Sequence, residues 1–248
     1  MKRHSDYPTI ASWESGSHFY GTASLTSDRD MLEVFLLPTR MVLRGENSDL
    51  SKVWKNPAQN TDYQAHELQK FLSLLQAGNI QFVELVLKGS REVPSNCPTE
   101  LLTCWDENKP KLEDLAYKVF SNYPFGHLKG WYLSTKKKVD AQGWSVKKAL
   151  LMYRVLVEAQ VFMDSGRVIP RVPELLEHSS SMLFQELFKA KVTNMRFNKF
   201  TYVEVELNKM FEEVSTLAQE RKTKHDLSEL TGDILESFRR TSLALEET

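Results

Sequence analysis

Residues 16–36, GSHFYGTASLTSDRDMLEVFL, join a Gly-Ser pair to two aspartates that precede an apolar run. The apolar run at 31–38, MLEVFLLP, has the length and the closing proline that are typical of a β-strand. If this strand begins near Asp28, its side chains alternate, and Asp28 and Asp30 share one face with Cα atoms about 6 to 7 Å apart. Two carboxylates this close repel each other, but their oxygens suit one or two magnesium ions. The stretch therefore predicts a strand that carries a metal-binding carboxylate pair.

The Gly-Ser pair lies before the aspartates at a spacing that lets both line one site. The ten residues 18–27 separate Ser17 from Asp28, enough for a turn or a short helix between neighbouring strands. Gly16 has no Cβ, so phosphate oxygens can approach the backbone, and the Ser17 hydroxyl and the following amides can donate to them. Each fragment alone is common in loops. Their combination favours a site for a nucleoside triphosphate and its metal.

Composition limits the classes of function. The chain has 248 residues, 41% of them hydrophobic, which is enough for one medium domain or two small ones. A net charge of -1 gives no general attraction to nucleic acid, so such a contact would need a local patch. No apolar segment reaches the length of a membrane span, and no membrane partner is expected. Cys97 and Cys104 have no second pair nearby, which predicts a reducing, cytoplasmic location and neither a zinc site nor a disulfide framework.

The apolar spacing is strand-like in the first part of the chain. Short apolar runs closed by Gly or Pro predict neighbouring strands of a small sheet at 7–16, 31–38 and 40–45. The polar segment 46–61 holds Pro57 and predicts a loop, with room for a helical turn.

From residue 66 the spacing becomes helical. In 66–79, HELQKFLSLLQAGN, the leucines and the phenylalanine fall on one helical face and Gly-Asn ends the segment, which predicts a helix packed on the sheet. Residues 80–89 fit a buried helix or a strand, and prolines interrupt the pattern between 90 and 110. Helical spacing follows at 111–120, 125–138, 146–166, 172–191, 201–222 and 227–247. The sequence thus predicts an α+β fold, with a small mixed-sheet module at 1–100 and a helical module at 101–248.

The stretch that contains the Gly-Ser pair and the Asp-x-Asp motif resembles a known signature. It is similar to that of the nucleotidyltransferase superfamily typified by DNA polymerase beta. More narrowly, it resembles the RNA repair pathway DNA polymerase beta family of predicted nucleotidyltransferases, whose motif is approximately G-S-H-A-Y-G-x-x-x-x-x-S-D-x-D-x-x-G-V-F. The matching positions are Gly16, Ser17, His18, Tyr20, Gly21, Ser27, Asp28, Asp30, Val34 and Phe35.

The resemblance extends beyond the motif. Residues 62–85 and 146–170 are similar to two further segments of that family, so the resemblance covers about residues 11–175. Two positions depart from the family pattern: Phe19 replaces a small residue, and Glu33 stands where glycine is usual. Neither departure removes a ligand, although both would reshape a pocket.

The resemblance implies that a nucleoside monophosphate passes from a nucleoside triphosphate to a hydroxyl, with release of pyrophosphate. Asp28 and Asp30 would hold Mg²⁺, or Mn²⁺ in its place. A third carboxylate usually comes from a neighbouring strand, and Asp62 is the first candidate, with Glu67 in reserve. Glu33 is a poor ligand because a regular strand points it away from the aspartate pair.

Several further residues are candidates for nucleotide contacts. Gly16 and Ser17 are already in this set, and the resemblance adds Ser27. A basic region extends from Lys129 to Arg154 with one acid inside it, and its lysine run at 136–138 is expected to be a solvated helix face. Lys148 and Arg154 lie in a segment that resembles the family and are the expected phosphate contacts. Aromatic residues in the same region are mostly expected in the core, with some able to stack on bases.

The sequence does not determine which molecule carries the acceptor hydroxyl. An RNA end is favoured by the family resemblance and by the basic, aromatic-rich region, and a protein hydroxyl is the alternative. A nucleotide-binding module without catalysis is a second class of function, which the absence of a third metal ligand would favour. A helical scaffold with an incidental motif is the third, and the similarity over both modules argues against it.

Overall fold

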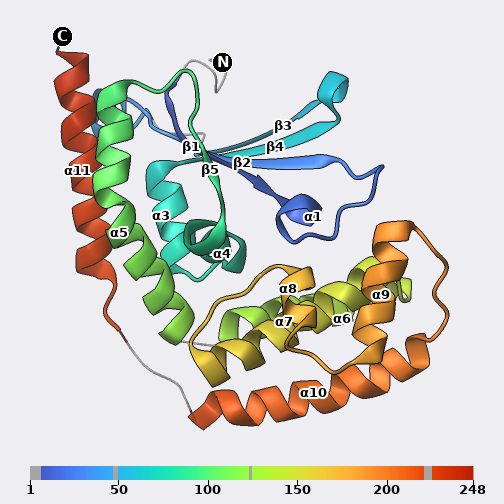
Figure 1. Cartoon of the computed structure of the whole chain (residues 1–248). Coiled ribbons are helices and arrows are strands. Elements are labelled where there is room, and N and C mark those ends of the chain that lie inside the picture. The colour runs from blue at the N-terminus through green and yellow to red at the C-terminus, as the bar shows by residue number, and fades with distance from the viewer. Residues whose placement is uncertain (1–6, 47–49, 123–124, 221–224, 248) are drawn as a thin grey trace. The chain divides into compact units, whose positions relative to one another are not determined.

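The computed structural model describes residues 7–46, 50–122, 125–220 and 225–247, and it has the α+β architecture that the sequence predicts. A five-stranded sheet forms from the N-terminal part of the chain, and helices follow (Figure 1). The strands are β1 (Thr9–Ser15), β2 (Arg29–Phe35), β3 (Ser51–Asn56), β4 (Thr61–Glu67) and β5 (Arg91–Glu92). Their order is β3-β4-β2-β1-β5, with β2 and β4 parallel and the other neighbours antiparallel, so the sheet is mixed.

The described helices lie between the strands of this sheet and after them. They are α1 (Gly16–Phe19), α2 (Thr39–Leu43), a 3-10 turn (Pro57–Gln59), α3 (Leu68–Gln76), α4 (Ile80–Lys88), α5 (Thr99–Asn122), α6 (Gly126–Gln142), α7 (Val146–Ser165), α8 (Val172–Leu176), α9 (Met182–Thr193), α10 (Phe200–Glu220) and α11 (Ser228–Glu246). Among the described residues, none of these helices combines the length and the apolar character that crossing a bilayer requires.

The chain forms two compact units. The first comprises Met1–Gly16, Asp28–Val119 and His225–Thr248, and the second comprises Ser17–Ser27 and Phe120–Lys224. The sheet, α2 to α4, most of α5 and the C-terminal helix α11 thus share one unit. The division into domains at residue 100 stays a prediction, and the compact units divide the chain differently.

An aromatic cluster joins the sheet of the first unit to four helices. Trp13 of β1 stacks on Phe71 of α3 at 6.0 Å between ring centroids and meets Trp105 of α5 edge-on at 5.6 Å. Phe71 also contacts Phe82 of α4, and Trp105 contacts Phe238 of α11. All five rings are buried, and aromatic pairs in such geometries stabilise a core beyond their area alone. This cluster explains why α11 groups with the N-terminal sheet.

Helix α3 confirms the prediction made for 66–79. Leu68, Phe71, Leu72 and Leu75 form its buried face. The Glu67 side chain caps the start by accepting a hydrogen bond from the Gln69 amide at 2.6 Å. Gly78, at φ 75°, follows its end. The next segment, which fitted a helix or a strand, is helix α4.

Two assignments in the first part of the chain were wrong. Residues 40–45, expected as a strand, lie largely in helix α2, which follows Pro38. The Glu246 carboxylate, far along the chain, accepts hydrogen bonds from the first amides of this helix, including that of Thr39 at 2.7 Å. The segment 46–61, expected as a loop, contains strand β3, which pairs with β4 along its whole length.

Pro110 was expected near a break but lies inside helix α5. Proline removes one backbone hydrogen bond from a helix and usually kinks or ends it. Here Leu112 and Leu115, which follow the proline, are both buried in the core. Their burial offsets the lost bond and lets the helix continue.

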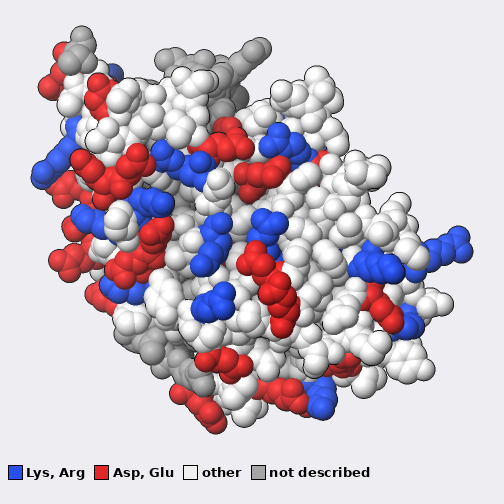
Figure 2. Space-filling view, in the orientation of Figure 1, with Lys and Arg blue, Asp and Glu red and all other residues white. Residues whose placement is uncertain are grey.

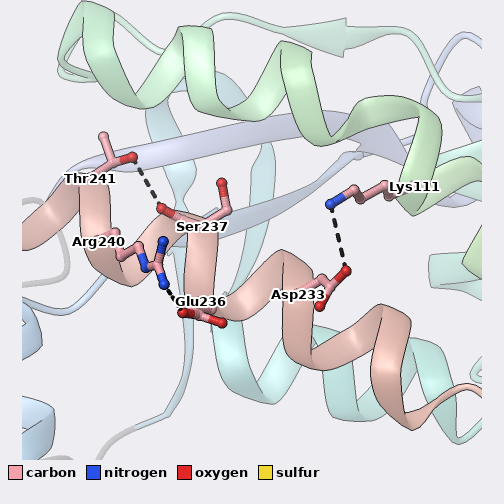
Figure 3. Close-up of a pocket in the computed structure, with 6 residues that line it drawn as sticks. All are labelled: Lys111, Asp233, Glu236, Ser237, Arg240 and Thr241. Carbon is pink, nitrogen blue, oxygen red and sulfur yellow. Dashed lines mark hydrogen bonds and ion pairs between the residues drawn. The ribbon is translucent and has the colours of Figure 1, made fainter.

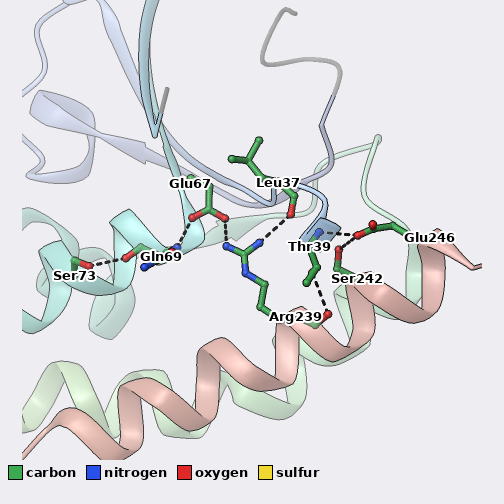
Figure 4. Close-up of polar contacts among 8 residues, drawn as sticks. All are labelled: Leu37, Thr39, Glu67, Gln69, Ser73, Arg239, Ser242 and Glu246. Carbon is green, nitrogen blue, oxygen red and sulfur yellow. Dashed lines mark hydrogen bonds and ion pairs between the residues drawn. The ribbon is translucent and has the colours of Figure 1, made fainter. Parts of the chain in front are cut away.

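The C-terminal helix is tied to one end of the sheet by a polar network (Figure 4). Arg239 donates to the Leu37 carbonyl oxygen at 2.9 Å and to a Glu67 carboxylate oxygen at 2.6 Å. Leu37 follows β2, and Glu67 is the last residue of β4. Arg239 therefore links the ends of the two parallel strands that begin at the aspartates.

The second unit is built around helix α7. Thirteen of its twenty residues are buried, and α6, α9 and α10 all pack against it. Tyr153 of α7 stacks on Phe184 of α9, and Tyr132 of α6 stacks on Phe211 of α10. The aromatic side chains interleaved with the basic region thus lie largely in the core.

Candidate metal centre

Three aspartates meet where β2 and β4 begin. Asp28, Asp30 and Asp62 each place a carboxylate oxygen within 4.8 Å of the other two. Asp30 and Asp62 are direct partners across the parallel pair β2–β4, and Asp28 immediately precedes β2. Asp28 is exposed, whereas the other two are half-buried. The structure therefore brings together the aspartate pair and the first candidate for a third carboxylate.

Backbone and side-chain contacts fix this end of the sheet. The Arg29 amide donates to the Asn60 carbonyl oxygen at 3.0 Å, which joins the start of β2 to the turn before β4. The Ser15 hydroxyl donates to the Asp30 carbonyl oxygen at 3.1 Å. The Arg29 side chain bonds Glu14 at 2.8 Å, which raises the pKa of the guanidinium. Glu14 pairs with Met31 rather than with Asp30, so this ion pair lies on the opposite face from the aspartates, as side-chain alternation requires.

The three carboxylates fit Mg²⁺ or Mn²⁺. Carboxylate oxygens are hard ligands, and these ions prefer oxygen to nitrogen or sulfur. Opposite ligands on one octahedral Mg²⁺ lie about 4.2 Å apart, since each Mg–O bond is about 2.1 Å. Two ions in such sites are about 3.5 to 4 Å apart. A set of oxygens spread over no more than 4.8 Å can therefore hold one or two ions with small side-chain adjustments.

Gly16 lies against Asp30. Its φ of 59° is a backbone conformation that favours glycine. A Cβ built on it would lie 2.7 Å from the carboxyl carbon of Asp30, closer than real Cβ atoms come to other atoms. Ser17 follows directly in the chain, in the short helix α1. The glycine of the motif is thus required by both its conformation and its nearest neighbour.

The reserve candidate, Glu67, is engaged elsewhere. It lies five residues beyond Asp62 on β4, about 17 Å along the strand, and an odd spacing places it on the other face. Its carboxylate is fully buried and bonded to Arg239 and to the start of α3. Glu33 pairs with Ala65 on the face opposite Asp30, as expected. Asp62 is therefore the third carboxylate that the geometry favours.

Lys55 is a member of this site that sequence reasoning missed. Its Nζ lies 2.7 Å from Oδ2 of Asp62, its partner in the β3–β4 pair. The hydrogen bond and charge of Asp62 raise the pKa of Lys55, with smaller contributions from Asp28 and Asp30. Assigning 46–61 to a loop concealed this residue, because only a strand places it opposite Asp62. The alternating pattern of β3 was the available signal.

Ser27 and Lys148 are bonded locally. Ser27 Oγ accepts a hydrogen bond from the Ser24 amide at 2.9 Å, which closes the turn before the aspartates. Lys148 Nζ donates to the carbonyl oxygens of Lys138, at 3.1 Å, and of Gly143, at 2.8 Å. These carbonyls lie at the C-terminal end of α6, where a cation is favourable. Contact of either side chain with a nucleotide stays a prediction.

Arg154 is buried inside the second unit, with 2% of its side chain exposed. It forms an ion pair with Glu158 at 2.8 Å, and its guanidinium stacks over the Tyr20 ring at 4.1 Å and near Trp131 at 5.5 Å. The motif residue Tyr20 and the later segment that resembles the family thus meet within this unit. Sequence reasoning did not anticipate Glu158, whose i+4 spacing from Arg154 was the signal. Arg154 as a phosphate contact stays a prediction.

A charged pocket and two cysteines of the first unit are weaker candidates for a functional site than the three aspartates. A pocket between α5 and α11 has paired charges: Lys111 lies 3.8 Å from Asp233, and Arg240 pairs with Glu236 (Figure 3). Figure 2 shows charges of both signs interspersed over this side of the unit.

Cys97 and Cys104 are not joined in a disulfide. Burial raises the pKa of Cys97 to about 11, so this thiol is protonated at neutral pH and is a weak nucleophile.

Comparison with known proteins supplies a family. A model of the RNA repair pathway DNA polymerase beta family matches residues 1–234, which is most of the chain. The match includes the Gly-Ser pair, all three aspartates and Lys55, and it ends before Arg239. No curated protein matches the chain.

Proposed function

The chain belongs to the RNA repair pathway DNA polymerase beta family, and from this premise we propose that it is a magnesium-dependent nucleotidyltransferase. The family description implies a DNA polymerase beta-like nucleotidyltransferase of RNA repair. In the proposed reaction, a nucleoside monophosphate passes from a nucleoside triphosphate to a hydroxyl at an RNA end. The single observation that supports this most strongly is the meeting of Asp28, Asp30 and Asp62.

In the proposed reaction, the acceptor hydroxyl displaces pyrophosphate from the α-phosphorus of the triphosphate. The oxygen of the acceptor hydroxyl attacks the α-phosphorus of the triphosphate and forms a new phosphodiester bond. The bond from the α-phosphorus to the bridging oxygen of pyrophosphate breaks, and pyrophosphate leaves with that electron pair. The hydroxyl proton passes to a base in solution. No electrons are exchanged with another molecule, so no redox cofactor is needed.

In this proposal, residues of the first unit and Ser17, which directly follows Gly16 in the chain, position these groups. Asp28 and Asp30 would hold the ions next to the triphosphate, and Asp62 would complete the ligand set on the side of β4. Divalent ions supply charge neutralisation of the triphosphate and a lowered pKa of the acceptor hydroxyl. Gly16 leaves space beside Asp30, and we assign to it and to Ser17 the contact with phosphate oxygens.

An RNA acceptor is favoured over a protein acceptor by two observations. The family description refers to RNA repair. In the second unit, Lys137, Lys138 and Lys147 are exposed, and positive side chains of this kind bind nucleic-acid phosphates. The aromatic residues around them are mostly buried, so electrostatic contacts rather than base stacking would dominate.

The test follows the α-phosphate. Purified protein is incubated with each nucleoside triphosphate labelled at the α-phosphate, with Mg²⁺, and with either RNA or host protein. We expect label to become covalently attached to RNA. No label in either acceptor would overturn the proposal, and label in protein alone would overturn the RNA acceptor.

A matched pair of double variants makes the test specific. Asp28→Ala with Asp30→Ala should abolish transfer, because it removes two ligands of the ion. Glu113→Ala with Asp114→Ala removes two exposed acids of helix α5 and should leave transfer unchanged. If the first double variant labels RNA as well as the wild type does, the mechanism is wrong.

A further inference from the structure

We propose that Lys55 is an internal competitor of the divalent ion at Asp62. In the metal-free protein its ammonium group occupies the carboxylate that the ion needs, and metal binding displaces it. This inference rests on the proposed function, since it assumes that Asp62 is a metal ligand. It assigns to Lys55 an effect on metal affinity, which neither the motif nor the family description assigns to any residue.

The backbone holds Lys55 opposite Asp62. The two residues are direct partners in the antiparallel pair β3–β4. Such partners have Cβ atoms about 4.5 to 5.5 Å apart. The Lys55 ammonium can therefore reach the Asp62 carboxylate directly, and the observed separation is 2.7 Å.

Hydrogen bonds connect the residues in the turn of this hairpin. Asn60 has a left-handed φ of 48°, and the Asn56 side chain donates to the Gln59 side-chain oxygen at 2.8 Å. The Thr61 hydroxyl donates to the Gln59 carbonyl oxygen at 3.0 Å. The backbone amide of Arg29, in β2, donates a hydrogen bond to the Asn60 carbonyl oxygen at 3.0 Å. Lys55 and the aspartates thus belong to one bonded backbone frame.

Charge explains why this contact forms and why an ion would break it. Asp28, Asp30 and Asp62 place up to three negative charges within a few ångströms of one another. One ammonium group neutralises part of that charge, whereas a divalent ion neutralises more and also repels the ammonium. The Lys55 side chain is 71% exposed, so it has room to move into solvent. Displacement therefore costs only the Lys55–Asp62 ion pair and the repulsion of the two cations.

A plain surface ion pair would look the same in the metal-free protein, so the test must measure metal affinity. Mn²⁺ binding to the purified full chain is measured by electron paramagnetic resonance without nucleotide. Lys55→Met removes the charge and retains most of the side-chain length. Lys52→Met is the matched control. It changes the net charge equally and lies on the same strand, but its Nζ lies over the Tyr7 ring and it pairs with Ala65 rather than with Asp62.

We expect Lys55→Met to bind Mn²⁺ about threefold to tenfold more tightly than the wild type, as one displaced ion pair and one relieved repulsion require. Lys52→Met should bind as the wild type does, and Lys55→Arg, which keeps the charge, should stay close to it. Unchanged or weaker binding by Lys55→Met would overturn the inference.

The same measurements distinguish an error in the proposed metal centre from an error in the role of Lys55. If Mn²⁺ binding is detected but is insensitive to Asp28→Asn with Asp30→Asn, the ion binds elsewhere, and both the metal centre and the role of Lys55 are wrong. If binding depends on the aspartates and Lys55→Met leaves it unchanged, only the role of Lys55 is wrong. Circular dichroism of each variant establishes that it is folded before binding is measured.

Discussion

Asp30 on β2 lies directly opposite Asp62 on the neighbouring parallel strand β4. The two residues are 32 positions apart in the sequence, and the pairing of the strands alone brings them together. With Asp28 they form a cluster of carboxylate oxygens that spans no more than 4.8 Å. This arrangement supports a metal centre at the start of the two strands.

Metal binding is expected to depend on the first two aspartates. Asp28→Asn with Asp30→Asn keeps the size of both side chains and removes their charge, so magnesium-dependent binding of a nucleoside triphosphate should be lost. Isothermal titration calorimetry with and without Mg²⁺ measures this. Unchanged binding would place the metal elsewhere.

Gly16→Ala should damage the site and the fold together. A residue with a Cβ is strained at a positive φ by about 1 to 2 kcal/mol, and this Cβ would also push the Asp30 carboxylate aside. We expect a lower free energy of unfolding in urea and weaker Mn²⁺ binding. Gly232→Ala, inside helix α11 with open space around it, is the control and should stabilise by about 0.5 to 1 kcal/mol. If both variants behave alike, the close approach of Gly16 to Asp30 is not important.

Arg239→Met should destabilise the first unit strongly. It leaves the fully buried Glu67 carboxylate without its counter-ion, and breaking a buried ion pair in this way costs about 3 to 5 kcal/mol. Urea unfolding of Arg239→Met measures this, and adding Glu67→Gln should restore part of the loss. Arg240→Ala breaks an exposed pair on the same helix and should change stability by about 0.5 kcal/mol or less. Equal effects of the two arginine variants would contradict this account of the network.

His66 is expected to make stability fall in mildly acidic solution. Burial, with a smaller contribution from the charge of Lys70, lowers the pKa of His66 below its usual value of 6.5. The unfolded chain then binds a proton at a higher pH than the folded protein does. Stability from this residue is therefore present above pH 6.5 and is lost as the pH falls toward the lowered pKa.

The His66 prediction is checked by urea unfolding of the wild type and of His66→Gln across that interval. The wild type should lose more stability than the variant as the pH falls from 7.5 to 5.5. A parallel decline of the two would assign the pH dependence to other groups.

The parts of the fold that depend on local pattern were predictable. Strand β2, helix α3 and most of the later helices follow from residue spacing within each segment. Strand β3 was missed because it is an edge strand on which no residue is fully buried, so its apolar signal is weak. Helix α2 was missed because Glu246, which caps it, lies about 200 residues away. Local patterns do not report such distant partners.

In the candidate site, too, local sequence patterns identified some residues and missed those that depend on distant partners. Asp28, Asp30 and Gly16 were identified within one continuous stretch, and Asp62 was chosen over Glu67 without knowledge of strand pairing. Lys55 could not be identified once its strand was taken for a loop. The partners of Arg154 and Lys148 depend on how helices pack in the second unit, which the helical spacing alone does not determine.

The rate of nucleotide transfer by Asp62→Asn shows whether the aspartate cluster is the catalytic metal centre. α-Labelled nucleoside triphosphate, Mg²⁺ and RNA are supplied to the wild type, to Asp62→Asn and to Asp114→Asn, whose aspartate also bonds a lysine at 2.7 Å but lies on helix α5. We expect Asp62→Asn to transfer label to RNA at least about 100-fold more slowly than the wild type, and Asp114→Asn to transfer it at the wild-type rate. Transfer by Asp62→Asn at the wild-type rate would contradict this expectation.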